Sequence, residues 1–125
     1  KKALMINDFC LKKDLFQDIL LQVNVSEDPN KGGARIEEVQ ELSSSISILE
    51  RLKIKGLMTI TEYSQDPEYS RMDYRKMKNL SLDIEKNLGV SLELSMGMSN
   101  DYRVALEEGS TIIRVGTKIF GERIK

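Results

Sequence analysis

Hydrophobic residues follow two kinds of spacing along the chain, and stretches of the two kinds alternate. The near-continuous apolar run from Ile19 to Val25 is typical of a strand buried in a parallel sheet, and Ile54 to Ile60 predicts a second strand. Between them, apolar residues recur every three or four positions from Ile36 to Leu49, which predicts a helix. Apolar positions compatible with a helix also lie within Lys1 to Lys13. The first half is therefore expected to form helix, strand, helix and strand.

The second half of the chain continues this alternation. Apolar positions from Met72 to Leu88 predict a helix that Gly89 can terminate, before a short strand from Val90 to Leu94. The stretch from Ser99 to Glu108 predicts a further helix, because it opens with Ser, Asn and Asp, which favour helix starts. Thr111 to Val115 is the fourth predicted strand. The predicted order is α-β-α-β-α-β-α-β.

Alternation of this kind predicts an α/β fold with a parallel sheet and right-handed crossovers. In such folds, functional groups gather on the loops at the C-terminal ends of the strands. Four strand-helix units are half of the eight that close a (β/α)8 barrel, and a whole barrel takes about 250 residues. Half a barrel leaves two sheet edges open, so we expect a second copy or a missing segment to cover them.

Composition narrows the functional classes. The 125 residues, 40% of them apolar, suit a single unit spanning 1–125 with one core. Lys and Arg number 19 against 20 Asp and Glu, and no basic stripe appears, which argues against nucleic-acid binding. The adjacent carboxylates Glu107 and Glu108 are expected on the solvated surface. We assign them no chemistry.

Cysteine and histidine usage narrows the classes further. Cys10 is the single cysteine, and no apolar run approaches the length of a membrane span, so we expect a cytoplasmic protein that contacts no membrane. Histidine is absent, which removes Ser-His and Cys-His nucleophile pairs and all histidine-based metal sites from this chain. We therefore assign no catalytic residue and no metal ligand.

An arginine lies inside the last predicted strand, and a glycine follows shortly after it. Arg114 stands between Ile113 and Val115, and a guanidinium is costly to bury unless a partner accepts its hydrogen bonds. The strand therefore points Arg114 at a polar pocket or a ligand. Gly116 lets the backbone approach a ligand closely, and the residues from Thr117 onward can present free amides at a short helix start. The Arg-x-Gly-Thr pattern predicts an anion site.

Each of these residues also has an interpretation that needs no ligand. Arg114 could form a buried ion pair, with Glu93 as its carboxylate. Ser99 could be a helix N-cap, which the residues alone favour. Gly116 could serve only as a tight turn, and Thr117 could be a cap. The last two roles are compatible with anion binding, because both use the same free amides.

Five segments of the chain stand in an informative order. They are Gln22 to Ser26, Lys31-Gly32, Lys55 to Ile60, Leu94 to Asp101 and Gly109 to Arg123. In this order they resemble the second half of the pyridoxal phosphate homeostasis proteins, which are relatives of the alanine racemase barrel domain. The Ser-Met-Gly-Met-Ser and Arg-x-Gly-Thr-x-Ile-Phe-Gly motifs, correctly ordered and about one helix apart, make the match specific.

The resemblance implies the C-terminal half of a TIM-type barrel of the alanine racemase type that holds pyridoxal 5'-phosphate. It places Ser99, Gly116 and Thr117 against the phosphate and Arg114 near the pyridine nitrogen. Proteins of this family carry the lysine that holds the cofactor covalently on the first barrel strand, and nothing before Gln22 matches that strand. The resemblance therefore implies that the N-terminal half is absent from this chain, together with that lysine.

The arginine also bears on the kind of activity that the resemblance implies. A permanently charged guanidinium beside the pyridine nitrogen discourages ring protonation and weakens the cofactor as an electron sink. No pair of positioned bases for racemisation can be named. The interpretation is a protein of vitamin B6 homeostasis that carries the cofactor without turnover. The alternative is a pyridoxal phosphate-dependent amino-acid racemase. The expected partner is the small-molecule cofactor, and a second copy or the N-terminal half would cover the open edges.

Overall fold

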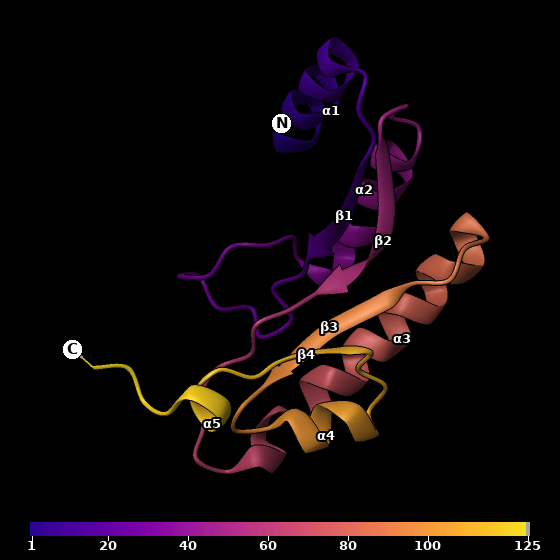
Figure 1. Ribbon diagram of the computed structural model, residues 1–125. Coiled ribbons are helices and arrows are strands. Elements are labelled where there is room, and N and C mark those ends of the chain that lie inside the picture. The colour runs from indigo at the N-terminus through magenta and orange to yellow at the C-terminus, as the bar shows by residue number, and fades with distance from the viewer. Residues whose placement is uncertain (125) are drawn as a thin grey trace.

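Four parallel strands lie side by side in the computed structural model, which describes residues 1–124 (Figure 1). The strands are β1 (Gln17–Gln22), β2 (Leu52–Met58), β3 (Glu93–Met98) and β4 (Ile112–Arg114), and they are paired in this order. All three pairings are parallel, which confirms the predicted sheet. The chain therefore has four of the eight parallel strands that a closed (β/α)8 barrel requires.

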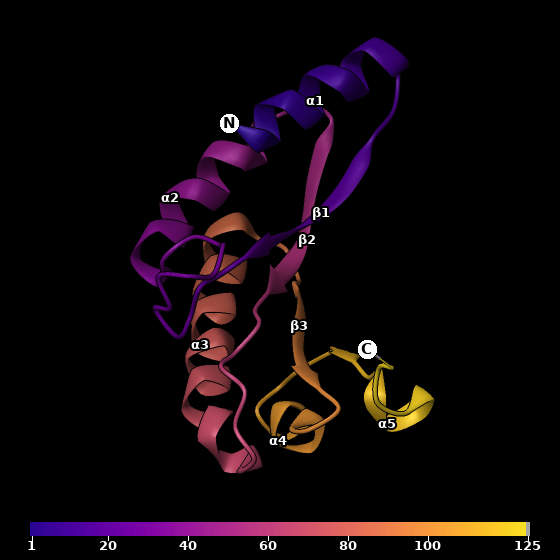
Figure 2. The ribbon, with the colours of Figure 1, turned by 90° about the vertical axis from the view of Figure 1, so that its left-hand side faces the viewer.

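Helices precede, connect and follow the strands. The two longest crossover helices, α2 (Ile36–Ser47) and α3 (Arg71–Leu88), lie along the same face of the sheet, as Figure 2 shows. The others are α1 (Lys2–Lys13), the 3₁₀ helix η1 (Pro67–Ser70), α4 (Tyr102–Glu107) and α5 (Thr117–Phe120). The predicted alternation is confirmed, and η1 and α5 add to it. Within residues 1–124, no helix combines the length and the apolar character that crossing a bilayer requires.

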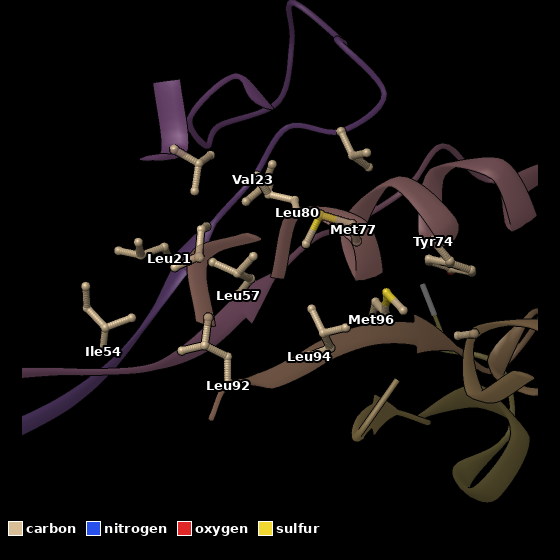
Figure 3. Packing of buried hydrophobic residues seen from close by; sticks show 14 of the residues in the cluster. Leu21, Val23, Ile54, Leu57, Tyr74, Met77, Leu80, Leu92, Leu94 and Met96 are labelled. Atoms are coloured by element: carbon tan, nitrogen blue, oxygen red, sulfur yellow. The ribbon is translucent and has the colours of Figure 1, made fainter. Parts of the chain in front are cut away.

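The core lies between the sheet and these crossover helices (Figure 3). Leu57 of β2 and both Leu94 and Met96 of β3 are at most 1% exposed, and Met77 and Ile84 of α3 are fully buried. Side chains of a strand alternate between two faces, so these strand residues share the face that α2 and α3 cover. Burial of such side chains is the main favourable contribution to folding.

The opposite face of the sheet is uncovered in the described part of the chain. Leu20 of β1 lies next to the buried Leu21, and Ile112 of β4 pairs with Ser95, which stands between the buried Leu94 and Met96. Leu20 and Ile112 are 38% and 39% exposed. In Figure 2 this face lies away from α2 and α3. The sequence led us to expect two open sheet edges in half a barrel, and the structure adds this apolar face, which is open to water among the described residues.

The third strand begins and ends later than predicted. The sequence placed it at Val90–Leu94, but β3 runs from Glu93 to Met98. Gly89 does end α3, in a left-handed conformation with φ of 69°, and the carboxylate of Glu85 then accepts a hydrogen bond from the Leu92 amide at 2.7 Å. The residues after Gly89 are therefore needed to turn the chain back into the sheet.

The start of the last crossover helix was also predicted wrongly. The sequence opened this helix at Ser99, but α4 begins at Tyr102 with Asp101 as its N-cap. The strand before it, β3, contains an irregularity, because three steps from Ser95 to Met98 match two steps from Ile112 to Arg114. This extra residue moves the end of β3 and the start of α4 along the chain.

Gly56 allows β2 and β3 to approach each other, and this generates a prediction. A Cβ atom at Gly56 would overlap the backbone carbonyl of Glu93 on the neighbouring strand. We expect Gly56→Ala to lower the free energy of unfolding by roughly 2–4 kcal/mol, because the strands must separate. Urea unfolding measures this loss. Gly116→Ala is the matched control, because a Cβ there meets no atom within 4 Å. An equal loss in both variants would contradict this account.

Candidate functional site

The C-terminal ends of the strands meet at one edge of the sheet, because all pairings are parallel. An open pocket of about 460 Å³ lies at this edge, between the loops that follow β2, β3 and β4. Figure 1 shows α4 and α5 at this end. The pocket is lined by Tyr63, Met98, Ser99, Asn100, Gly116, Thr117, Phe120, Gly121 and Arg123.

Ser99 joins the last two loops of the site. Its Oγ accepts hydrogen bonds from the backbone amides of Gly116 and Lys118, both at 3.2 Å. The N-cap of α4 is Asp101, so the interpretation of Ser99 as the cap of that helix is wrong. Amides that converge on one oxygen are also the arrangement that binds an anion. The structure thus brings Ser99 and the turn after β4 together.

Two glycines at this edge differ in whether the fold requires them. Gly97 has φ of +101°, and a Cβ there would lie 2.6 Å from the Cβ of Ala105, so the end of β3 needs a glycine where it packs against α4. Gly116 has φ of −114°, and a Cβ there meets nothing within 4 Å. Packing therefore does not explain the glycine at 116. Thr117 follows it as the first residue of α5, and both line the pocket.

Arg114 is held across the sheet at the end of β2. Its Nη2 donates a hydrogen bond to the backbone carbonyl of Thr59 at 2.6 Å, and Thr59 is itself fixed because its Oγ1 donates to the carbonyl of Val23 at 2.7 Å. Its Nε is buried and has no hydrogen-bond partner among the residues described. The ion pair with Glu93 is not formed in this part of the chain. Arg114 does not line the pocket, so Ser99, Gly116 and Thr117 gather there without it.

Basic side chains lie beside the turn after β4. The Nζ of Lys118 lies 5.6 Å from the ring centroid of Tyr102, and Nε of Arg103 donates to the Tyr102 hydroxyl at 3.3 Å. The hydrogen bond from Arg103, and then its charge, lower the pKa of Tyr102. Arg123 lines the pocket itself. This side of the site therefore carries positive charge, which favours a negatively charged ligand.

Sequence reasoning missed Tyr63, Phe120 and Arg123 as lining residues. Tyr63 and Phe120 are 77% and 85% exposed, so they do not belong to the buried apolar pattern from which the elements were predicted. The available signal was their position at the C-terminal edge of the sheet, because Tyr63 lies on the loop after β2, and Phe120 and Arg123 follow β4, Phe120 at the end of α5.

A group of ion pairs fixes α4 to α3, and it corrects the prediction for Glu108, whereas Glu107 is largely exposed as predicted. Glu108 contacts Arg71 at 2.7 Å and Arg75 at 2.9 Å, and its side chain is only 13% exposed. Glu107 meets Arg71 at 3.2 Å. Hydrogen bonds from Arg75 and Arg71 lower the pKa of Glu108 to about 2. Glu108 is therefore a partner in a structural network and not a freely solvated carboxylate.

Comparisons with known proteins agree with this fold. The sequence pattern of the family described as "Alanine racemase, N-terminal domain" matches residues 1–124. The chain is 44% identical over 113 residues to a pyridoxal phosphate homeostasis protein of Aquifex aeolicus, covering 90% of the chain and 50% of the relative. It is 38% identical over 124 residues to one of Schizosaccharomyces pombe, covering 98% and 52%. The chain thus spans about half the length of these curated relatives.

Solved structures share the arrangement of the elements. PipY of Synechococcus elongatus with PLP bound superposes with a TM-score of 0.82 at 27% identity, covering 95% of this chain and 56% of that one. An alanine racemase of Clostridium difficile has a TM-score of 0.75 at 17% identity, covering 99% and 34%. This second likeness concerns the fold alone, and it identifies the sheet as part of a barrel of the alanine racemase type.

The lowered pKa of Glu108 predicts how stability depends on pH. A folded pKa of about 2, against an ordinary 4.5, means that the ionised carboxylate contributes stability above about pH 4.5. This contribution is lost as the pH falls from there towards 2. We expect Glu108→Gln to be less stable at neutral pH and to lose less stability between pH 5 and pH 2. Urea unfolding at stepped pH measures this.

Glu107→Gln is the matched control, because the Glu107 side chain is 62% exposed. We expect that variant to keep the pH dependence of the unsubstituted protein. An unchanged pH dependence in Glu108→Gln would show that the network does not stabilise the fold as described.

Proposed function

Since the chain belongs to the alanine racemase N-terminal domain family, we propose that it forms the C-terminal half of a barrel that binds pyridoxal 5'-phosphate. The assignment to the C-terminal half is supported by the ordered segments from Gln22 onward. The length is in keeping with it, because the chain spans about half of each curated relative. The N-terminal half would then cover the open face of the sheet and supply the lysine that holds the cofactor covalently.

The phosphate would bind where the last two loops meet. One observation carries this proposal: the amides of Gly116 and Lys118 converge at 3.2 Å on the Oγ of Ser99. An anionic oxygen beside this hydroxyl would find donors that are already oriented. The open space beside Gly116 lets a ligand approach the backbone, and Thr117 adds a hydroxyl at the pocket. Ser99, Gly116 and Thr117 thus fit a phosphate.

Arg114 would lie near the pyridine nitrogen of the cofactor. Its Nη2 is anchored on Thr59, while its Nε has no partner among the described residues, so the guanidinium keeps capacity to donate. When bound, pyridoxal phosphate supplies a reactive aldehyde and a ring that can withdraw electrons. The permanent charge of Arg114 discourages protonation of the ring nitrogen, which weakens that withdrawal. The chain's own residues therefore favour holding the cofactor over strong carbanion chemistry.

The activity that follows is cofactor homeostasis. We infer a carrier that keeps the aldehyde sequestered and delivers it, and the relatives are named pyridoxal phosphate homeostasis proteins. The alternative, an amino-acid racemase, requires a positioned base on each face of the substrate. Prolonged incubation of the full-length protein with one enantiomer of alanine separates the two. Sustained loss of optical purity would reject the carrier function.

The phosphate position predicts the effect of a side chain at residue 116. Gly116→Val places two methyl groups beside the pocket, so we expect the dissociation constant for pyridoxal 5'-phosphate to rise about tenfold or more in the full-length protein. Pyridoxal, which lacks the phosphate, should bind almost as before. Absorbance titration measures both ligands. Equal weakening for both would argue against a phosphate at this turn.

The ring position predicts a different pattern for Arg114. Arg114→Gln removes the charge. We expect the dissociation constants for pyridoxal 5'-phosphate and for pyridoxal to rise by similar factors, on the order of tenfold, because both ligands carry the pyridine ring. Its absorbance spectrum with ligand should also shift as the ring nitrogen becomes easier to protonate. Glu93→Gln serves as control, because Glu93 makes no ion pair with Arg114 in the described structure. A variant that loses affinity only for the phosphorylated ligand would place Arg114 at the phosphate instead.

A further inference from the structure

A buried tyrosine of α3 holds the loop that carries Ser99. The hydroxyl of Tyr74 donates a hydrogen bond to Oδ2 of Asp101 at 2.6 Å, and the two residues are 1% and 8% exposed. Burial, and then the hydrogen bond to Asp101, raise the pKa of Tyr74 well above its usual range. The phenol therefore stays protonated as the donor at physiological pH.

Asp101 uses its other carboxylate oxygen to close the turn around Ser99. The amide of Met98 donates to Oδ1 at 3.0 Å, and the amide of Asp101 donates back to the carbonyl of Met98 at 3.2 Å. Residues 98–101 thus form a locked turn in which Ser99 is the second residue. Asp101 is the N-cap residue of α4, but its side chain makes no capping hydrogen bond. Its carboxylate orients the loop and not the helix.

The same hydroxyl connects this turn to the loop after β2. The Oγ1 of Thr61 lies 3.3 Å from the Tyr74 hydroxyl, and the hydroxyl of Ser70 donates to Thr61 at 3.0 Å. The side chain of Asn100 donates to the carbonyl of Ser64 on that loop. The loops after β2 and β3 are therefore joined through side chains that do not themselves touch the amides of Gly116 and Lys118.

We propose that Tyr74 and Asp101 form a strut that positions Ser99 for the phosphate of the cofactor. This inference rests on the proposed function, because it assigns a role within the same site. Ser99 can accept hydrogen bonds from the amides of Gly116 and Lys118 only if its turn keeps its direction. Asp101 sets that direction, because one carboxylate oxygen accepts from the Met98 amide and the other from the Tyr74 hydroxyl. Tyr74 and Asp101 are positioning residues, and neither lines the pocket.

The first test measures the affinity of the full-length protein for two ligands. In Tyr74→Phe the ring still fills its site but the hydroxyl is lost, so we expect the dissociation constant for pyridoxal 5'-phosphate to rise about tenfold. The constant for pyridoxal should change by less than about twofold, because pyridoxal has no phosphate to misplace. If the strut had only a structural role, Tyr74→Phe would weaken the binding of both ligands by similar factors.

The chain offers a matched control. The hydroxyl of Tyr69 also donates to a carboxylate, Glu62, at 3.1 Å, but this pair is exposed, and among the described residues its side chains form no hydrogen bond with residues 98–101. We expect Tyr69→Phe to leave both dissociation constants unchanged. If Tyr74→Phe folds poorly, Asp101→Asn is the second variant. The asparagine side chain keeps the shape of the aspartate but loses its charge, so this variant should also lower the affinity for pyridoxal 5'-phosphate relative to pyridoxal.

The second test needs no cofactor. Amide hydrogen exchange, followed by NMR, reports whether Gly116 and Lys118 keep their acceptor. In Tyr74→Phe we expect these two amides to exchange roughly fivefold faster or more, because the loop opens locally more often. Amides within α2 should keep their rates. Tyr69→Phe should change neither. Uniformly faster exchange, or unchanged exchange at Gly116 and Lys118, would overturn the strut.

The two tests separate the strut from the proposed function. If the unsubstituted protein binds pyridoxal as tightly as pyridoxal 5'-phosphate, the phosphate site is wrong, and so is the role of the strut in serving it. If the unsubstituted protein prefers the phosphorylated ligand and Tyr74→Phe keeps that preference in full, the phosphate site stands and the strut is rejected.

Discussion

The register between β3 and β4 is the constraint on which the site depends. Met98 pairs with Arg114, so the chain leaves both strands at the same level, and Ser99 emerges beside the turn at Gly116. This register exists because β3 contains one residue more than β4 over the same stretch, and Gly97 occupies that stretch with φ of +101°. A regular strand would reverse the faces of Met98 and its neighbours and would move Ser99 away from the amides that it now accepts.

The elements of the fold follow from local patterns, whereas the contacts of the site do not. The period of α2 and the stop at Gly89 are both properties of a few consecutive residues, which is why the sequence predicted them. The residues alone favoured Ser99 as a cap because capping is a local preference. Its actual donors lie 17 and 19 residues away in the chain. The resemblance to a family placed Ser99 at this turn, and no periodicity or propensity could have done so.

Long-range partners also explain which contacts of charged residues the sequence did not reveal. The alternative ion pair of Arg114 with Glu93 is not formed among the described residues, and Arg114 instead donates to a backbone carbonyl 55 residues away, which no composition argument can identify. The pair Glu107 and Glu108 was expected in water because adjacent positions on a helix face outward at different angles. The two arginines that reach Glu108 lie at i and i+4 on α3 and so share one face of that helix, but Glu108 meets this face only once α3 and α4 are packed.

These contacts make α3 the common support of the site. The helix α4 has only six residues, too few to be stable on hydrogen bonds of its own. It is fixed at both ends from one face of α3, because Tyr74 binds Asp101 at its start while Arg71 and Arg75 bind Glu108 at its end. The direction of the Ser99 turn is therefore set by packing between two helices. The open face of the sheet has no part in it, so this corner of the barrel can hold its geometry before that face is covered.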